Sequence, residues 1–287
     1  MRWTSTLATP GWVGQGWHDH ACWFHTGRQS WCDVLVPFFA EAVLRGEAML
    51  YVSDKSVEEL TEDLETLPGR DALLRTGQLR FLPVEPVRGM TGGQAVADQL
   101  GTLRSAATDA VEAGYARVRI AAESAHPVQG RADAVRFVHS ELMIDEVVAR
   151  TPVALLCGYD GRYLDRRAAA ALAFVHPVRQ HAAFGAGSGL YAEPDAADFW
   201  HVYGELDLAS RDVFEIALDA LPVHGDVHMR LHELAFIDVG GVHALADFAE
   251  RISPRRLVLH DPPTALRRIV ELSRADFPAM RRVVAEV

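Results

Sequence analysis

The order of hydrophobic and polar positions predicts strands alternating with helices along the first two thirds of the chain. One broad apolar face recurs at helical spacing from about residue 30 to 45, where Gly46 stops it and Pro37 makes a kink possible. Ser56 and Glu59 form a capping-box pattern that opens the next helix. The other predicted elements are strands at 20–25, 48–53, 79–83, 116–122 and 153–159, and helices at about 93–113 and 131–150. This alternation predicts an α/β fold with a mainly parallel sheet and helices on both of its faces.

The stretch AAFGAGSGLY, residues 182–191, interrupts this rhythm with three glycines and a serine, a composition typical of linkers. Beyond it the rhythm resumes on a smaller scale. The predicted strands there are 199–204, 226–231 and 256–260, and the predicted helices are about 210–221, 241–251 and 263–273. We therefore expect a first domain at 1–182, a linker at 183–191 and a small α/β domain at 192–287.

Composition narrows the classes of partner and the compartment. With 28 Lys+Arg against 39 Asp+Glu the net charge is -11, which gives no electrostatic reason to bind nucleic acid or an anionic membrane surface. No apolar run approaches the roughly 20 residues that span a bilayer, and the start of the chain lacks a signal-peptide core, so we expect a cytoplasmic protein. Cys22, Cys32 and Cys157 are odd in number and form no CxxC pair, so we expect free thiols.

Three stretches of the second domain carry a family resemblance: HVYGELDLAS (201–210), LHELAFIDVGGVHALADFAE (231–250) and LVLHDPPTALRRIVELS (257–273). In this order they resemble a STAS domain, the fold of anti-sigma factor antagonists. The resemblance implies a protein partner, most simply an anti-sigma factor of the serine-kinase type. It assigns partner contact to Gly204, Asp207, Asp238, Val239, Gly240 and Gly241.

The loop Asp238 to Gly241 departs from the phosphorylatable members of that family. Val239 stands where those members carry the acceptor serine, and valine has no hydroxyl, so we expect the phosphorylation switch to be absent. Asp238 has a second interpretation, since Asp is a common cap before an apolar-periodic helix. Capping and partner contact can coexist in one loop.

Six short stretches of the first domain, taken in order, resemble a MEDS domain: HACWFH (20–25), LRGEAMLYVSD (44–54), RVRIAAES (117–124), SELMIDEV (140–147), LLCGYDGRYL (155–164) and AFVHPV (173–178). That family is a sensory module with a RecA-like, KaiC-like fold, found in regulators that respond to small organic molecules. The resemblance implies a small-molecule pocket lined by His20, Cys22, Arg119, Glu123, Glu141, Cys157, Tyr159, Asp160 and His176. These residues lie mainly at or just after predicted strand ends, where open parallel sheets form pockets.

RecA-like ATPases follow their first strand with a glycine-rich loop that ends in Lys-Ser/Thr, because backbone N–H groups and the lysine cradle phosphates. Here that place reads HTGRQS, residues 25–30, with one glycine and no lysine, so we do not expect ATP hydrolysis. Arg28 is interpreted as an ordinary solvated arginine. Glu123 and Glu141 could serve as acid and base, but the chain has no nucleophile elbow, HExxH motif or Rossmann fingerprint, so we predict no catalytic residues and no enzyme activity.

The stretch HDHACWFH, residues 18–25, raises the question of a metal. Side chains alternate along a strand, which places His20, Cys22 and Phe24 on one face and Ala21, Trp23 and His25 on the other. His18, His20 and Cys22 could gather around zinc, with a fourth ligand such as Glu123, Asp160 or His176. We favour pocket-lining or structural roles, and expect no metal and no cofactor.

The patterns and resemblances together predict a signalling regulator in which a sensory domain controls a STAS output domain. Two alternatives stay open at this point. One is a degenerate nucleotide- or metal-binding enzyme, which would carry bound nucleotide or stoichiometric metal. The other is a non-catalytic scaffold of a signalling assembly, and homo-oligomerisation is left open for either.

Overall fold

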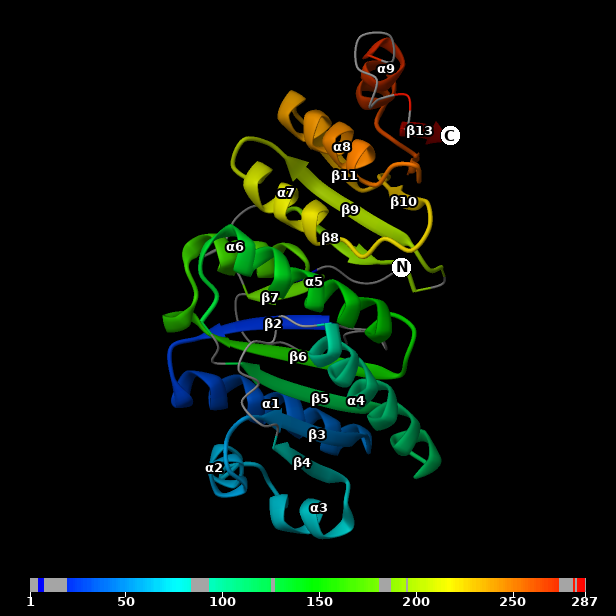
Figure 1. Cartoon of the computed structure of the whole chain (residues 1–287). Helices are drawn as coiled ribbons and strands as arrows, with labels where there is room; N and C mark the ends of the chain where they lie inside the picture. The colour runs from blue at the N-terminus through cyan, green and yellow to red at the C-terminus, as the bar shows by residue number, and fades with distance from the viewer. Residues whose placement is uncertain are drawn as a thin grey trace.

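The computed structural model describes residues 5–7, 20–83, 93–124, 127–180, 187–194, 196–273, 281 and 283–286, whose strands form two sheets (Figure 1). The first sheet has the strand order β1-β7-β2-β6-β5-β3-β4. Its strands are β1 Ser5–Leu7, β2 His20–His25, β3 Ala48–Ser53, β4 Leu79–Pro83, β5 Val118–Ser124, β6 Val153–Asp160 and β7 Val178–Gln180. Every neighbouring pair is parallel, which confirms the predicted parallel sheet.

Helices cover both faces of this sheet, as predicted. One face carries α1 Arg28–Arg45, α2 Val57–Asp63 and α3 Arg70–Thr76, which bury Trp31, Leu60 and Leu73 in one apolar cluster. The other face carries α4 Gly93–Glu112, α5 Gly130–Val148 and α6 Arg166–Phe174, which contribute Leu100, Phe137 and Leu172 to a second cluster. A short 3-10 turn, η1 Gly161–Tyr163, follows β6.

Local signals in the sequence set the ends of these helices. Gly46 ends α1 in the left-handed conformation (φ 65°), which glycine adopts without steric cost, and Pro37 lies inside that helix. Ser56 accepts a hydrogen bond from the backbone N–H of Glu59, whose carboxylate accepts one from the Ser56 N–H. The predicted capping box of α2 is thereby confirmed.

The second sheet has the order β11-β9-β10-β12-β13, and β8 pairs with β9 in the antiparallel sense. Its elements are β8 Gly189–Ala192, β9 Phe199–Leu206, α7 Arg211–Ala220, β10 Val227–Arg230, β11 Leu234–Ile237, α8 Val239–Arg251, β12 Leu257–His260, α9 Thr264–Ser273 and β13 Val283–Glu286. The strand β8 contains the last three residues of the expected linker, because Leu190 and Tyr191 are fully buried against β9. The first four residues of that linker, 183–186, lie outside the described residues.

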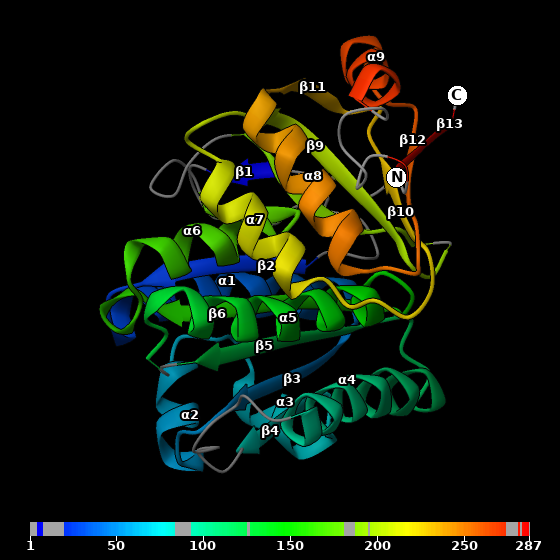
Figure 2. The ribbon, with the colours of Figure 1, turned by 45° about the horizontal axis from the view of Figure 1, so that its top comes forward.

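The two domains are packed against one another through helices. Helices α5 and α6 lie between the first sheet and α7 of the second domain (Figures 1 and 2). One apolar cluster runs through both domains, and across it the rings of Phe174 on α6 and Phe214 on α7 have centroids 6.2 Å apart. Polar contacts surround this core: Arg131 Nη2 donates to Asp219 Oδ2 at 2.7 Å, and His139 Nδ1 donates to the Ala220 carbonyl at 2.7 Å. A continuous interface therefore joins the domains in addition to the connecting segment.

Candidate functional site

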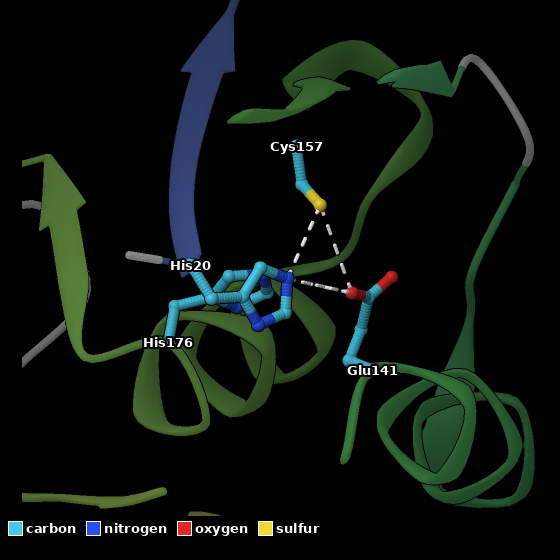
Figure 3. A group of neighbouring side chains, drawn as sticks. All are labelled: His20, Glu141, Cys157 and His176. Carbon is cyan, nitrogen blue, oxygen red and sulfur yellow. Dashed lines mark hydrogen bonds and ion pairs between the residues drawn. The ribbon is translucent and has the colours of Figure 1, made fainter. Parts of the chain in front are cut away.

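Four buried side chains meet between the first sheet and helices α5 and α6 (Figure 3). His20 begins β2, Glu141 lies in α5, Cys157 lies in β6, and His176 follows α6. The His20 Nε2 atom is 3.3 Å from Cys157 Sγ and 3.5 Å from Glu141 Oε2. Glu141 Oε2 is also 3.8 Å from Cys157 Sγ and 3.6 Å from His176 Nε2. We call these four residues the buried cluster, because none is more than 5% exposed.

Two hydrogen bonds outside the cluster fix the orientation of its histidine rings. Asp145 lies one turn after Glu141 on the same face of α5, and its Oδ1 lies 3.2 Å from His20 Nδ1. The Leu172 carbonyl accepts from His176 Nδ1 at 2.7 Å. Because a carbonyl and a carboxylate accept, each Nδ1 is the donor and each Nε2 faces Glu141 and Cys157.

Burial and neighbouring charges set the protonation states in the cluster. Burial alone would disfavour a charged His20, but the carboxylates of Asp145 and Glu141 outweigh it and raise its pKa. Burial, with a smaller contribution from the charge of His20, lowers the pKa of His176 to about 3. Burial and Glu141 together raise the pKa of the Cys157 thiol. The two carboxylates therefore favour the protonated form of His20, while burial favours a neutral His176 and a protonated Cys157 thiol.

A separate polar network lies on the opposite face of the sheet, at the carboxyl ends of β3 and β5. Lys55 Nζ contacts Glu123 Oε2 at 2.5 Å and Asp63 Oδ2 at 2.7 Å. The Tyr51 hydroxyl lies 2.8 Å from Asp63 Oδ2 and 3.1 Å from Glu123 Oε2. Arg28, expected to be solvated, donates to Asp63 Oδ1 at 2.8 Å. Burial raises the pKa of Glu123 even with Lys55 beside it. The network neutralises its own carboxylates, so its contacts indicate a structural role.

The nine residues assigned to one sensory pocket do not form one pocket, because the first sheet separates them. His20, Cys22, Glu141, Cys157, Tyr159 and His176 lie on the side of α5 and α6, while Arg119, Glu123 and Asp160 lie on the side of α1. Arg119 is held in a buried ion pair with Glu47, Nε to Oε2 at 2.5 Å. Asp160 accepts hydrogen bonds from Arg162 at the end of β6. The sheet therefore holds six of the nine residues on one side and three on the other, and His20 lies at the first residue of β2 rather than at its carboxyl end.

Cys22 and Tyr159 lie on the α5 side of the sheet beside the buried cluster. Cys22 is fully buried and is the register partner of Cys157. The four ligand atoms that are close enough to share one ion include the sulfur of Cys157 and not that of Cys22. Tyr159 packs its ring against His176, with centroids 6.0 Å apart. The alternative zinc set that includes His18 cannot be placed, since His18 lies outside the described residues.

In the second domain, two loops lie at the carboxyl ends of β9 and β11. Asp238 caps α8, its Oδ1 accepting from the Gly241 N–H at 2.8 Å, and Asp207 accepts from the Ala209 N–H at 3.0 Å. The two loops lie close together. The side chain of Arg211, which follows the first loop, packs against Gly240 in the second, where an added Cβ would lie 3.1 Å from Arg211 Cδ. We call residues 207–210 and 238–241 the docking edge.

Gly204, the remaining residue assigned to partner contact, lies elsewhere. Its φ is +81°, and an added Cβ would lie 2.0 Å from the Gly187 carbonyl oxygen and 2.6 Å from Ser188 Cα. Only glycine fits where the segment before β8 crosses β9 so closely. Its position indicates a role in the joint between the domains.

Comparison with known families agrees with this arrangement. A family model described as MEDS, the MEthanogen/methylotroph, DcmR Sensory domain, matches residues 19–177, more than half of the chain. The chain belongs to the MEDS family. A second model, described as the Mlab, STAS domain, matches residues 190–281, so a STAS domain follows the MEDS domain in the order predicted from the sequence. A search of curated proteins found no significant match to the chain.

MEDS and STAS are sensory and regulatory families rather than enzyme families, and their combination fits a signalling regulator. Across the residues that the structure describes, none of the helices is both long enough and apolar enough to cross a bilayer. Sequence reasoning missed Asp145, which orients His20. The sequence did contain a sign of this role, because Asp145 follows Glu141 by four residues, a spacing that places both carboxylates on one face of a helix.

Proposed function

We propose that this chain is a signalling regulator in which the MEDS domain controls how the STAS domain engages a protein partner, an anti-sigma factor of the serine-kinase type. The observation that carries the proposal is the packing of α5 and α6 of the MEDS domain on α7 of the STAS domain. Helix α7 begins directly after residues 207–210, which form half of the docking edge. A displacement of α5 or α6 has a direct mechanical route to that edge.

The docking edge has the chemistry of a protein contact. Leu208 is 82% exposed and Val239 is 67% exposed, while Phe236 on the adjacent β11 is half exposed. The carboxylates of Asp207 and Asp238 flank these apolar side chains. Exposed apolar groups beside charges are typical of interaction surfaces, and this set favours a partner with an apolar patch bordered by basic residues.

The residues of the edge also support control without phosphorylation. Val239, the first residue of α8, occupies the place of the acceptor serine and offers no hydroxyl. Ser210 in the neighbouring loop is 4% exposed, and its Oγ accepts from the Asp207 N–H at 2.9 Å. With no accessible hydroxyl at either position, the partner kinase has no acceptor here, and the state of the MEDS domain takes over that control.

The test is affinity capture from a lysate of the source organism, with bound proteins identified by mass spectrometry. The baits are the wild-type chain, Leu208→Asp, Val239→Asp and Asp238→Asn, the last of which keeps a capping side chain and removes the charge. Val111→Asp serves as the matched control, because Val111 is 54% exposed on α4 of the MEDS domain.

We expect wild type and Val111→Asp to recover a kinase-type anti-sigma factor, and Leu208→Asp and Val239→Asp to lose it. Asp238→Asn should reduce recovery, since it removes one carboxylate facing the partner. Recovery of no such factor by wild type would contradict the proposed partner. Equal recovery by wild type and Val239→Asp would contradict the assigned edge.

A further inference from the structure

Four separations within the buried cluster lie close to the edges of a metal-coordination tetrahedron. Metal–ligand bonds of about 2.0 to 2.3 Å in a tetrahedral zinc site place neighbouring ligand atoms about 3.3 to 3.6 Å apart. The separations from His20 Nε2 are 3.3 Å to Cys157 Sγ and 3.5 Å to Glu141 Oε2. Those from Glu141 Oε2 are 3.6 Å to His176 Nε2 and 3.8 Å to Cys157 Sγ. All four ligand atoms lie within 4.8 Å of one another.

The donor set selects a class of cation. Two imidazole nitrogens, one sulfur and one carboxylate oxygen suit zinc and other borderline divalent ions, whereas calcium and magnesium prefer sites made of oxygen alone. The His176 Nε2 atom is buried without a hydrogen bond and faces Glu141. A cation between these atoms would give this nitrogen a partner.

The contacts behind the histidines are those that metal-binding histidines use. In metal sites the second ring nitrogen donates to a carboxylate or a backbone carbonyl, which fixes the tautomer and aims the first nitrogen at the ion. His20 has Asp145 in that role, and His176 has the Leu172 carbonyl. Each histidine therefore presents Nε2 to the centre of the cluster.

We propose that the buried cluster binds one divalent cation of the zinc class, and that Asp145 connects this ion to the STAS domain. The four side chains fill all four positions of the tetrahedron, with Cys157 bound as a thiolate, and all of them are buried. Such closed sites are typical of structural or sensing metals, because they leave no open coordination position for catalysis. Neither part of this proposal depends on which protein partner the STAS domain binds.

The connection runs through two hydrogen bonds of one carboxylate. Asp145 Oδ1 accepts from His20 Nδ1 at 3.2 Å, and Asp145 Oδ2 accepts from the Ala192 N–H of β8 at 2.7 Å. Asp145 is fully buried, and β8 pairs with β9, the strand that leads into the docking edge. A metal that holds His20 therefore also holds the first strand of the STAS sheet.

The site is tested on the full chain, stripped with a chelator and loaded with Zn²⁺ or Co²⁺. We expect one ion per chain by elemental analysis. The Co²⁺ form should show the thiolate charge-transfer absorption and the intense visible bands of a tetrahedral site. Cys157→Ser should abolish the charge-transfer band, while the matched control Cys22→Ser should keep it, since Cys22 is buried on the same face as the register partner of Cys157.

Two further variants protect this test from a failure to fold. If circular dichroism shows that Cys157→Ser is unfolded, His176→Gln replaces it, and this variant should lower the number of metal ions bound per chain. His232→Ala should leave it unchanged, although His201, His232 and Glu233 form a second group in the STAS domain. Wild type without stoichiometric metal would overturn the site, as would a charge-transfer band that survives Cys157→Ser and disappears in Cys22→Ser.

The connection is tested by hydrogen exchange of the peptide that contains Ala192, with and without Zn²⁺. In wild type the metal should slow exchange of β8. In Asp145→Asn the effect of metal on β8 should be lost, and metal affinity should fall about 10- to 100-fold, the usual effect of losing a partner behind a ligand. Equal exchange of β8 with and without bound metal in wild type would overturn the connection and leave the site standing.

Discussion

Phe174 and Phe214 provide a quantitative test of whether the two domains share one core. Phe174 is 3% exposed on α6, Phe214 is 1% exposed on α7, and their rings are tilted by 55° with centroids 6.2 Å apart. Truncation of a buried Phe to Ala costs about 3–5 kcal/mol. Two such changes approach the whole stability of a domain, which is about 5–15 kcal/mol. Leucine is the better substitution, because it removes the ring pair and keeps an apolar side chain.

From the lost apolar carbons we expect Phe174→Leu and Phe214→Leu each to lower the free energy of unfolding by about 1–2 kcal/mol. The aromatic pair contributes about 0.5–1.5 kcal/mol beyond burial. Because either single substitution already removes that contribution, the double variant should lose about 0.5–1.5 kcal/mol less than the sum of the singles.

Urea unfolding of the full chain, followed by far-ultraviolet circular dichroism, measures these differences. Phe39, fully buried on α1 across the first sheet, gives the control pair with Phe214. Substitutions at that pair should be additive within about 0.5 kcal/mol. A Phe174–Phe214 coupling free energy no larger than the control value would refute the shared core. So would unfolding of the two domains in separate steps, of which Phe214→Leu affects only one.

Two other substitutions test local features. Gly204→Ala should lower the melting temperature by several degrees, because its Cβ would meet the Gly187 carbonyl at 2.0 Å and its φ is +81°. Gly101→Ala, in open space on α4, should instead stabilise by about 0.5–1 kcal/mol. Glu47→Gln removes the carboxylate that buried Arg117 and Arg119 share, although Glu41 Oε2 stays 3.3 Å from Arg119, and it should cost about 3–5 kcal/mol in urea unfolding. A loss below 1 kcal/mol would contradict that ion pair.

Much of the fold could be predicted from local pattern. The alternation along β2 places Cys22 and Phe24 in one apolar cluster and Ala21 and Trp23 at the other, as expected. Helix α6, RRAAAALAF, was missed because it is only nine residues long and five of them are alanine, so few large apolar side chains mark its buried face. Helix α3 is only seven residues long. Both become visible only through packing on the sheet.

The candidate site could be predicted only in part, because it depends on register. Alternation along β6 places Cys157 and Asp160 on opposite faces of the sheet. Which of these two faces carries Glu123 depends on the register of β5 against β6, in which Glu123 pairs with Gly158. Local pattern does not contain that register. The arrival of Glu141 and His176 at the same point depends on how α5 and α6 dock, which is a property of the whole domain.

The buried face of α7 limits how this molecule can be divided. A fragment that began near residue 188 would keep every strand of the STAS sheet, yet it would expose Phe214 and its neighbours where α5 and α6 now lie. Such a fragment should self-associate, since exposed apolar helix faces find other partners. A chimera that joins this STAS domain to another sensor must supply a surface shaped like α5 and α6. The place where the two families meet in sequence is therefore not a place where the molecule can be cut.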